Sequence, residues 1–128
     1  MCIRDRDEVD LDKWIFFIVT NLAPMMGQVN WFRNYHETNN EDALKRFETQ
    51  TYRTFDVLEA QLKKAGSGFI LPGGFSAVDA HAYPWIHQYT FAKLSLDNYP
   101  HIRTWHGAIG ERQEVKRAYE KIPAGKEM

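Results

Sequence analysis

The sequence predicts an all-α protein, a bundle of about five helices in one domain. Three observations predict this fold class. Apolar residues recur three or four positions apart through most of the chain, and no segment shows the alternation typical of a strand. The 128 residues are enough to enclose one hydrophobic core. The hydrophobic fraction of 44% and the charged fraction of 26% are those of an ordinary globular domain.

The first helix is expected from about Glu8 to Gly27. One of its faces carries residues three or four apart: Leu11, Trp14, Phe17, Ile18 and Asn21. Phe16 and Val19 make other faces apolar too, whereas a surface helix has a single apolar stripe. We therefore expect this helix to be covered on more than one side. Pro24 and Gly27 are expected to bend or end it.

The longest helix is expected from Glu41 to about Ala65. Its inner stripe advances by three or four residues at every step: Leu44, Phe47, Thr51, Phe55, Leu58 and Leu62. Asn40 or Asn39 is suited to cap its start, because a short polar side chain accepts a hydrogen bond from a free N–H there. Gly66 or Gly68 is suited to the left-handed conformation that ends a helix.

A third helix is expected from Ser76 to about Lys93. Ser76 followed by Asp79 is typical of a capping box, in which the two side chains accept hydrogen bonds from the first backbone N–H groups. We interpret both residues as structural caps, since Asp79 is an acid in an apolar setting. Pro84 removes one helical hydrogen bond and is expected to kink the middle of this helix.

Two shorter helices are expected after Pro100, which is placed at a first helical turn. Their stripes are Ile102, Trp105 and Ile109, then Val115, Ala118, Tyr119 and Ile122. Pro123 is expected to close the last one. The domain organisation is thus a disordered or foreign stretch over 1–9, a helical domain over 10–123 and a polar tail over 124–128.

Composition excludes several function classes. The net charge is −1 with acidic and basic residues interleaved, so no nucleic-acid footprint or polybasic membrane patch is expected. The apolar run "WIFFIV" is too short to span a bilayer. A single cysteine, Cys2, excludes a disulfide framework and indicates a reducing, cytoplasmic location.

The histidines do not predict a metal site. Helical metal-binding pairs lie three or four residues apart, but His81 and His87 are six apart, and His101 and His106 are five apart. The sequence also lacks a nucleophile elbow, a phosphate loop and a dinucleotide fingerprint. From the residues alone, we predict a helical domain without chemistry of its own.

Three segments resemble the glutathione transferase C-terminal domain: "LPGGFSAVDAHAYPWI", "APMMGQVNWF" and "YPHIRTWHGAIGERQEVKRAY". They are most similar to the bacterial Nu-class and fungal nitrogen-regulator-like groups, over about Asp10 to Ile122. Gln113 departs from the pattern, which usually has proline there. The resemblance implies an N-terminal thioredoxin-like domain, absent from this chain, that carries the glutathione site. It also implies a homodimer.

The resemblance implies binding roles but no catalytic residue in this half. A wall for small apolar electrophiles would comprise Met25, Met26, Gln28, Trp31 and Phe32. The alternative is that these residues belong to the core. Arg46 matches the position of an arginine that binds glutathione across the dimer, and Arg53 is a weaker match. The alternative for Arg46 is a surface salt bridge to Asp42, one helical turn earlier.

The implied function belongs to the intact protein, which would conjugate glutathione to electrophiles or reduce disulfides and peroxides with it. We expect this chain alone to have little or no transferase activity. A noncatalytic interaction or regulatory module is the alternative. An open pocket lined by Met25, Trp31 and Tyr119 favours the enzyme, and a filled one favours the module.

Overall fold

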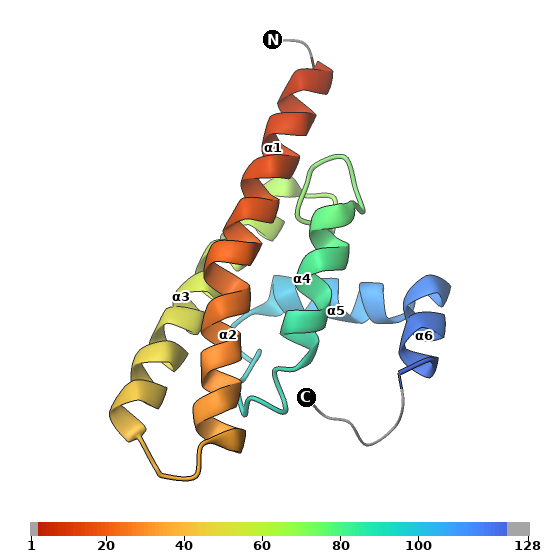
Figure 1. Ribbon diagram of the computed structural model, residues 1–128. Coiled ribbons are helices and arrows are strands. Elements are labelled where there is room, and N and C mark those ends of the chain that lie inside the picture. Colours follow the sequence, from red (N-terminus) through yellow and green to blue (C-terminus); the bar gives the residue numbers. More distant parts are fainter. Residues whose placement is uncertain (1–2, 123–128) are drawn as a thin grey trace.

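A computed structural model describes residues 3–122, with side chains from Asp7 onward. Its elements in chain order are α1 (Ile3–Phe17), η1 (Ile18–Leu22), α2 (Ala23–Asn30), η2 (Trp31–Tyr35), α3 (Glu41–Ala65), α4 (Ala77–His87), α5 (Pro100–Gly110) and α6 (Gln113–Glu120). The η segments are π-helical turns that join α1 and α2 into one long helix (Figure 1). Within the described range the chain thus forms five helices, which confirms the all-α prediction.

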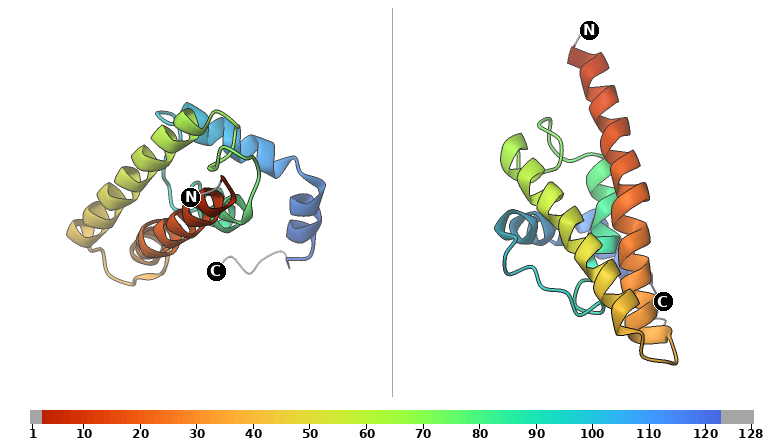
Figure 2. Two further views of the ribbon diagram at one scale, coloured as in Figure 1. Left: turned by 90° about the horizontal axis from the view of Figure 1, so that it is seen from above. Right: turned by 90° about the vertical axis from the view of Figure 1, so that its left-hand side faces the viewer.

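Helix α4 is the centre of the arrangement. The long helix and α3 lie side by side and antiparallel, and α4 packs against α1 and η1 on one side and α5 on the other (Figures 1 and 2). Helix α5 also contacts α3, and α6 follows it at the edge of the domain. The core between them contains fully buried side chains from each main element: Ile18, Leu22, Met26, Phe55, Leu58, Val78, Ala82, Ile86, Ile102, Trp105 and Ile109.

The long helix begins and ends outside the limits that the sequence pattern predicts. It starts at Ile3, so residues 3–9, for which we predicted disorder, are helical, and its first turns project beyond the rest of the domain (Figure 2). It continues through Pro24 and Gly27 to Tyr35. Residues 1–2 and the predicted tail 124–128, with Pro123, lie outside the described residues. That 1–9 is foreign to the natural protein stays a prediction.

The two π turns explain this continuity. Five inward-facing residues recur every four positions: Trp14, Ile18, Leu22, Met26 and Asn30. An α-helix with about 3.6 residues per turn would rotate such a series steadily off one face. A π turn holds more residues, because each N–H bonds to the carbonyl five positions back, as Ala23 does to Ile18. The series therefore stays on the core side, and Asn21, predicted on the buried face, is exposed instead.

Helix α3 agrees with the sequence pattern at both ends. It runs from Glu41 to Ala65, and the side chain of Asn40 accepts a hydrogen bond from the backbone N–H of Ala43 at 3.1 Å. Gly66 ends it with a φ of 69°, the left-handed conformation that glycine adopts without strain. The predicted stripe faces the core, with Thr51, Phe55, Leu58 and Leu62 buried.

Helix α4 is shorter than predicted, because it ends at His87 rather than near Lys93. The chain then forms turns, and Lys93 has a positive φ of 53°. Arg33 of η2 holds this segment: its guanidinium donates to the carbonyl oxygens of Ala92 at 2.7 Å and Lys93 at 3.0 Å, and it pairs with Glu48 at 3.1 Å. These partners lie far away in sequence. Among the described helices, none is long and apolar enough to cross a membrane.

Candidate functional site

The predicted capping residues form a buried junction at the start of α4. Asp79 is 0% exposed, and one oxygen of its carboxylate accepts a hydrogen bond from the backbone N–H of Ser76 at 2.9 Å. Its other oxygen accepts bonds from the Trp105 indole N–H at 2.8 Å and the backbone N–H of Ile70 at 3.0 Å. Ser76 in turn accepts a bond from the Val78 N–H at 3.2 Å. The capping prediction is confirmed, and Asp79 also joins α4 to α5 and to the preceding loop.

The five predicted wall residues do not share one environment. Met26 is 0% exposed and belongs to the core of the domain, whereas Trp31 is 53% exposed. Met25 and Phe32 are half-buried, and Gln28 is exposed. Phe32 stacks on Phe47 of α3 with ring centroids 5.7 Å apart. The structure thus takes one methionine into the core and leaves the others at or near the surface of the long helix.

Trp31 belongs to an aromatic surface, which we define as the exposed Trp31 and Tyr35 and the half-buried Phe91. The Trp31 and Tyr35 rings stack with centroids 6.3 Å apart, and Tyr35 meets Phe91 at 6.1 Å. The π turn η2 carries the first two rings, and π turns are frequent at functional sites. Flat aromatic faces of this kind suit contacts with apolar, planar ligands.

Arg46 lies on the exposed side of α3. It has no ion pair or hydrogen bond with another side chain in the described part of the chain, so the predicted alternative, a salt bridge to Asp42, is not formed there. A nearby arginine of η2, Arg33, is instead fixed against Glu48. The Arg46 guanidinium therefore has its donors open to solvent.

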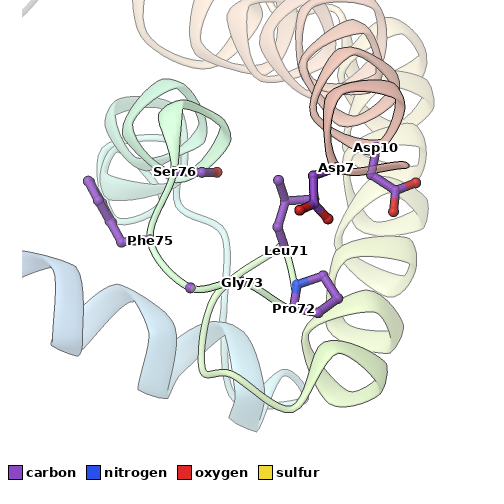
Figure 3. Close-up of a pocket in the computed structure, with 8 residues that line it drawn as sticks. Asp7, Asp10, Leu71, Pro72, Gly73, Phe75 and Ser76 are labelled. Carbon is purple, nitrogen blue, oxygen red and sulfur yellow. The ribbon is translucent and has the colours of Figure 1, made fainter. Parts of the chain in front are cut away.

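A hollow of about 190 Å³ lies between α1 and the loop from Leu71 to Ser76. Figure 3 shows Asp7 and Asp10 of α1 on one side and the loop on the other. The carboxylate of Asp10 pairs with Lys13 at 3.2 Å. Two carboxylates at its wall disfavour an anionic ligand such as a free peptide carboxylate. We therefore do not place a glutathione site in this hollow.

Two histidines that lie nineteen residues apart in the sequence, His87 and His106, are adjacent in the structure. His87 Nδ1 at the end of α4 lies 2.9 Å from His106 Nε2 on α5, and the Tyr83 hydroxyl lies 3.2 Å from the same His87 nitrogen. Tyr119 of α6 covers His87 edge-on with centroids 4.9 Å apart, and Tyr89 meets His106 edge-on at 5.8 Å. The sequence analysis weighed only His81 with His87 and His101 with His106, so it did not predict this pair. Spacing on one helix misses a pair formed between two helices.

Burial shapes the electrostatics of this cluster. Removal from water lowers the pKa of His87 and of His106, and the neighbouring His87 lowers the pKa of His106 further. Burial raises the pKa of Tyr83 and, together with the nearby Tyr83, that of Tyr119. At neutral pH the cluster therefore consists of neutral imidazoles and neutral phenols.

Apolar side chains on the long helix remain uncovered. Phe16 is 68% exposed, and Val9 and Val19 are exposed on the same helix. Val57 of α3 is a further exposed apolar residue. Large apolar residues gathered on one element mark a contact surface more often than scattered single ones do.

Comparison with known proteins identifies the family of this domain. The family model for the glutathione S-transferase C-terminal domain matches residues 41–108. The disulfide-bond oxidoreductase YfcG of Escherichia coli K12 is 29% identical over 115 residues, which cover 90% of this chain and 53% of YfcG. The chain therefore belongs to the glutathione S-transferase C-terminal domain family.

Solved structures agree with this assignment. The glutathione transferase URE2P6 of Phanerochaete chrysosporium, in complex with oxidized glutathione, superimposes with a TM-score of 0.80 at 25% identity, over 88% of this chain and 52% of that one. Yeast Ure2p in complex with glutathione superimposes with a TM-score of 0.82 at 21% identity, over 90% of this chain and 53% of Ure2p. This likeness shows that the fold is shared. The chain thus spans about half the length of the relatives that it matches.

Proposed function

We propose that this chain is the helical half of a glutathione-dependent enzyme that conjugates glutathione to electrophiles or reduces disulfides with it. The observation that carries this proposal is the uncovered apolar side of α1 and η1 in a chain that spans half of its relatives. Family members are dimers with an N-terminal thioredoxin-like domain, and these uncovered side chains fit such a neighbour. A cytoplasmic location stays a prediction from the single cysteine.

The substrate wall of this proposal lies at the end of the long helix. Met25, Gln28, Trp31 and Phe32 are its members, and Met26 supports them from the core. Methionine and aromatic side chains adapt to apolar ligands of different shape. Because Trp31 is the most exposed of them, we expect it to contribute most to substrate contact.

Arg46 is the proposed contact to glutathione across the dimer. Its guanidinium is exposed and has donors to spare, and it can hold a carboxylate with two parallel hydrogen bonds. Glutathione supplies such carboxylates. Arg53, also exposed on α3, is the weaker candidate.

The test is to join this chain to the N-terminal domain of E. coli YfcG and measure glutathione binding by calorimetry. We expect the folded fusion to bind glutathione, and Arg46→Ala to weaken binding about tenfold or more, because charged hydrogen bonds are lost. Arg103→Ala is the matched control, since Arg103 is exposed on α5 and lies outside the proposed site. Equal affinity in the two variants removes Arg46 from the site.

A noncatalytic interaction module is the second candidate. Trp31 contacts Tyr35 and His36, whereas Tyr119 contacts Tyr83 and His87, so two residues expected in one pocket lie in separate clusters. A folded, dimeric fusion that fails to bind glutathione would support the module and reject the enzyme.

A further inference from the structure

We propose that His87 and His106 form a binding site for a divalent transition-metal ion of the copper or nickel type, with the Tyr83 hydroxyl beside it. The site lies between the end of α4 and α5, with Tyr119 of α6 against His87, and it belongs neither to the proposed substrate wall nor to the Arg46 contact. The two imidazoles come from different helices, nineteen residues apart.

The geometry of the pair carries this proposal. The ring centroids lie 5.2 Å apart at an interplanar angle of 20°, while the facing nitrogens lie 2.9 Å apart. The two distances differ by about the width of one imidazole ring, so the rings lie edge to edge and share one N–H···N hydrogen bond. With metal–nitrogen bonds of about 2.0 Å, neighbouring ligands of a tetragonal ion lie about 2.8 Å apart. The two nitrogens already have the separation that such an ion requires.

Binding exchanges the hydrogen bonds that His87 Nδ1 makes with His106 and with Tyr83 for two metal–nitrogen bonds. Both rings tilt so that the lone pairs of His87 Nδ1 and His106 Nε2 converge on the ion. The ring nitrogen that donated the hydrogen bond loses its proton to solvent, and the other nitrogen of the same ring takes up a proton. Each ligand therefore stays a neutral imidazole. Partial removal from water lowers the pKa of both histidines and keeps them in this form at neutral pH.

The surroundings favour an open, tetragonal site. Within the described residues, no group of three or more His, Cys, Asp or Glu side chains could enclose a metal ion, which disfavours a closed tetrahedral zinc site. His87 is exposed, so water fills the remaining positions. Among divalent ions, Cu²⁺ binds nitrogen donors most tightly.

The experiment titrates the full 128-residue chain with copper sulfate, followed by calorimetry and electron paramagnetic resonance. Cys2 is replaced by Ser in every sample, because a thiolate binds and reduces Cu²⁺. We expect one equivalent to bind, with a spectrum that shows coupling to two imidazole nitrogens. His87→Gln and His106→Gln each weaken binding by about tenfold or more. The control His81→Gln, on an exposed position of α4, leaves affinity unchanged.

A second measurement is independent of whether the His106 variant folds. Because the ion joins α4 to α5, NiCl₂ raises the melting temperature of the Cys2→Ser chain. The exposed variant His87→Gln abolishes this rise. Copper affinity that is the same in His87→Gln and His81→Gln, or a spectrum without coupling to two imidazoles, overturns the proposal.

Discussion

The two ends of α4 are built on opposite principles. At its start, Asp79 is completely buried and both of its carboxylate oxygens accept hydrogen bonds. At its end, His87 is exposed, and its ring belongs to a cluster contributed by three helices. The start was predicted correctly from a spacing of three residues, whereas the end was predicted too late, near Lys93, and the ring cluster there was not predicted. Local hydrogen bonds are visible in a sequence, whereas pairs between helices depend on how the helices pack.

The comparison also holds within the Asp79 junction itself. The bond from the Ser76 N–H is local and was predicted. The bonds from the Trp105 indole and the Ile70 N–H reach 26 and nine residues along the chain. No spacing rule predicts these two bonds, because they form only when α5 and the loop pack against α4.

The largest effect is expected from Asp79→Ala. It removes the acceptor for three N–H donors around a buried position, and unsatisfied buried donors are costly. We expect the free energy of unfolding to fall by about 3 kcal/mol or more, well beyond loss of a cap alone. Urea denaturation measures it. Asp12→Ala, at an exposed position of α1, serves as control. A loss of only about 1 kcal/mol would mean that the tertiary bonds add little beyond the cap.

A middle-sized effect is expected from Glu59, which caps a helix from a distance. Its carboxylate on α3 accepts bonds from the backbone N–H groups of His101 and Ile102 at the start of α5, each at 2.9 Å. We expect Glu59→Ala to cost about 1–2 kcal/mol of unfolding free energy, as other cap deletions do. Thermal and urea unfolding at pH 7 measure it.

The pH dependence tests the same cap. Burial alone would raise the pKa of Glu59, but the hydrogen bonds from His101 and Ile102 outweigh it and lower the pKa below 4.5. A lowered folded-state pKa contributes stability above the unfolded value, which is lost as the pH falls through the folded value. Acidification from pH 5 to pH 3 therefore destabilises the parent more than Glu59→Ala. Parallel pH profiles would contradict the capping role.

The smallest effect is expected from the histidine pair. Without added metal, His87→Gln combined with His106→Gln removes the partly exposed hydrogen bonds that His87 makes with His106 and with Tyr83, and costs about 0.5–1.5 kcal/mol. Because both folded-state pKa values lie below 6.5, the parent loses stability as the pH falls from about 6.5 through those values. Denaturation at pH 8 and pH 5 measures the difference, and the double variant should show a flatter profile. If the unfolding free energy of the double variant changed with pH as much as that of the parent does, other titrating groups would be responsible for the pH dependence.

Sequence alone predicted what is encoded within one turn or one periodic stripe. The limits of α3, the cap at Asn40 and the left-handed Gly66 follow from local rules, and all three are confirmed. The end of α4 was missed because Arg33, sixty residues before its contact at Lys93, holds the following turns. Of the predicted wall, Met26 and Trp31 have the same apolar character in the sequence. Only packing decides that one is core and the other surface.

The buried residues of the long helix are spaced four apart, and this spacing is visible in the sequence. It is less common than the mixed spacing of three and four residues in an ordinary α-helix. Trp14, Ile18, Leu22 and Met26 repeat it without a break, which a plain α-helix cannot keep on one face. A stripe of this kind indicates π turns. Pro24, which has no N–H to donate, stands in the first turn of α2 directly after η1.

A π turn amounts to one surplus residue accommodated inside an α-helix. Shortening η1 by a single residue, for example by deleting the exposed Val19, would let that turn relax to ordinary α geometry while Trp14 and Met26 keep their facing. A one-residue deletion in α3, which contains no π turn, would rotate the helical residues that follow the deletion away from the core. Length variation among natural homologues should therefore be found at η1 and η2, and not within α3.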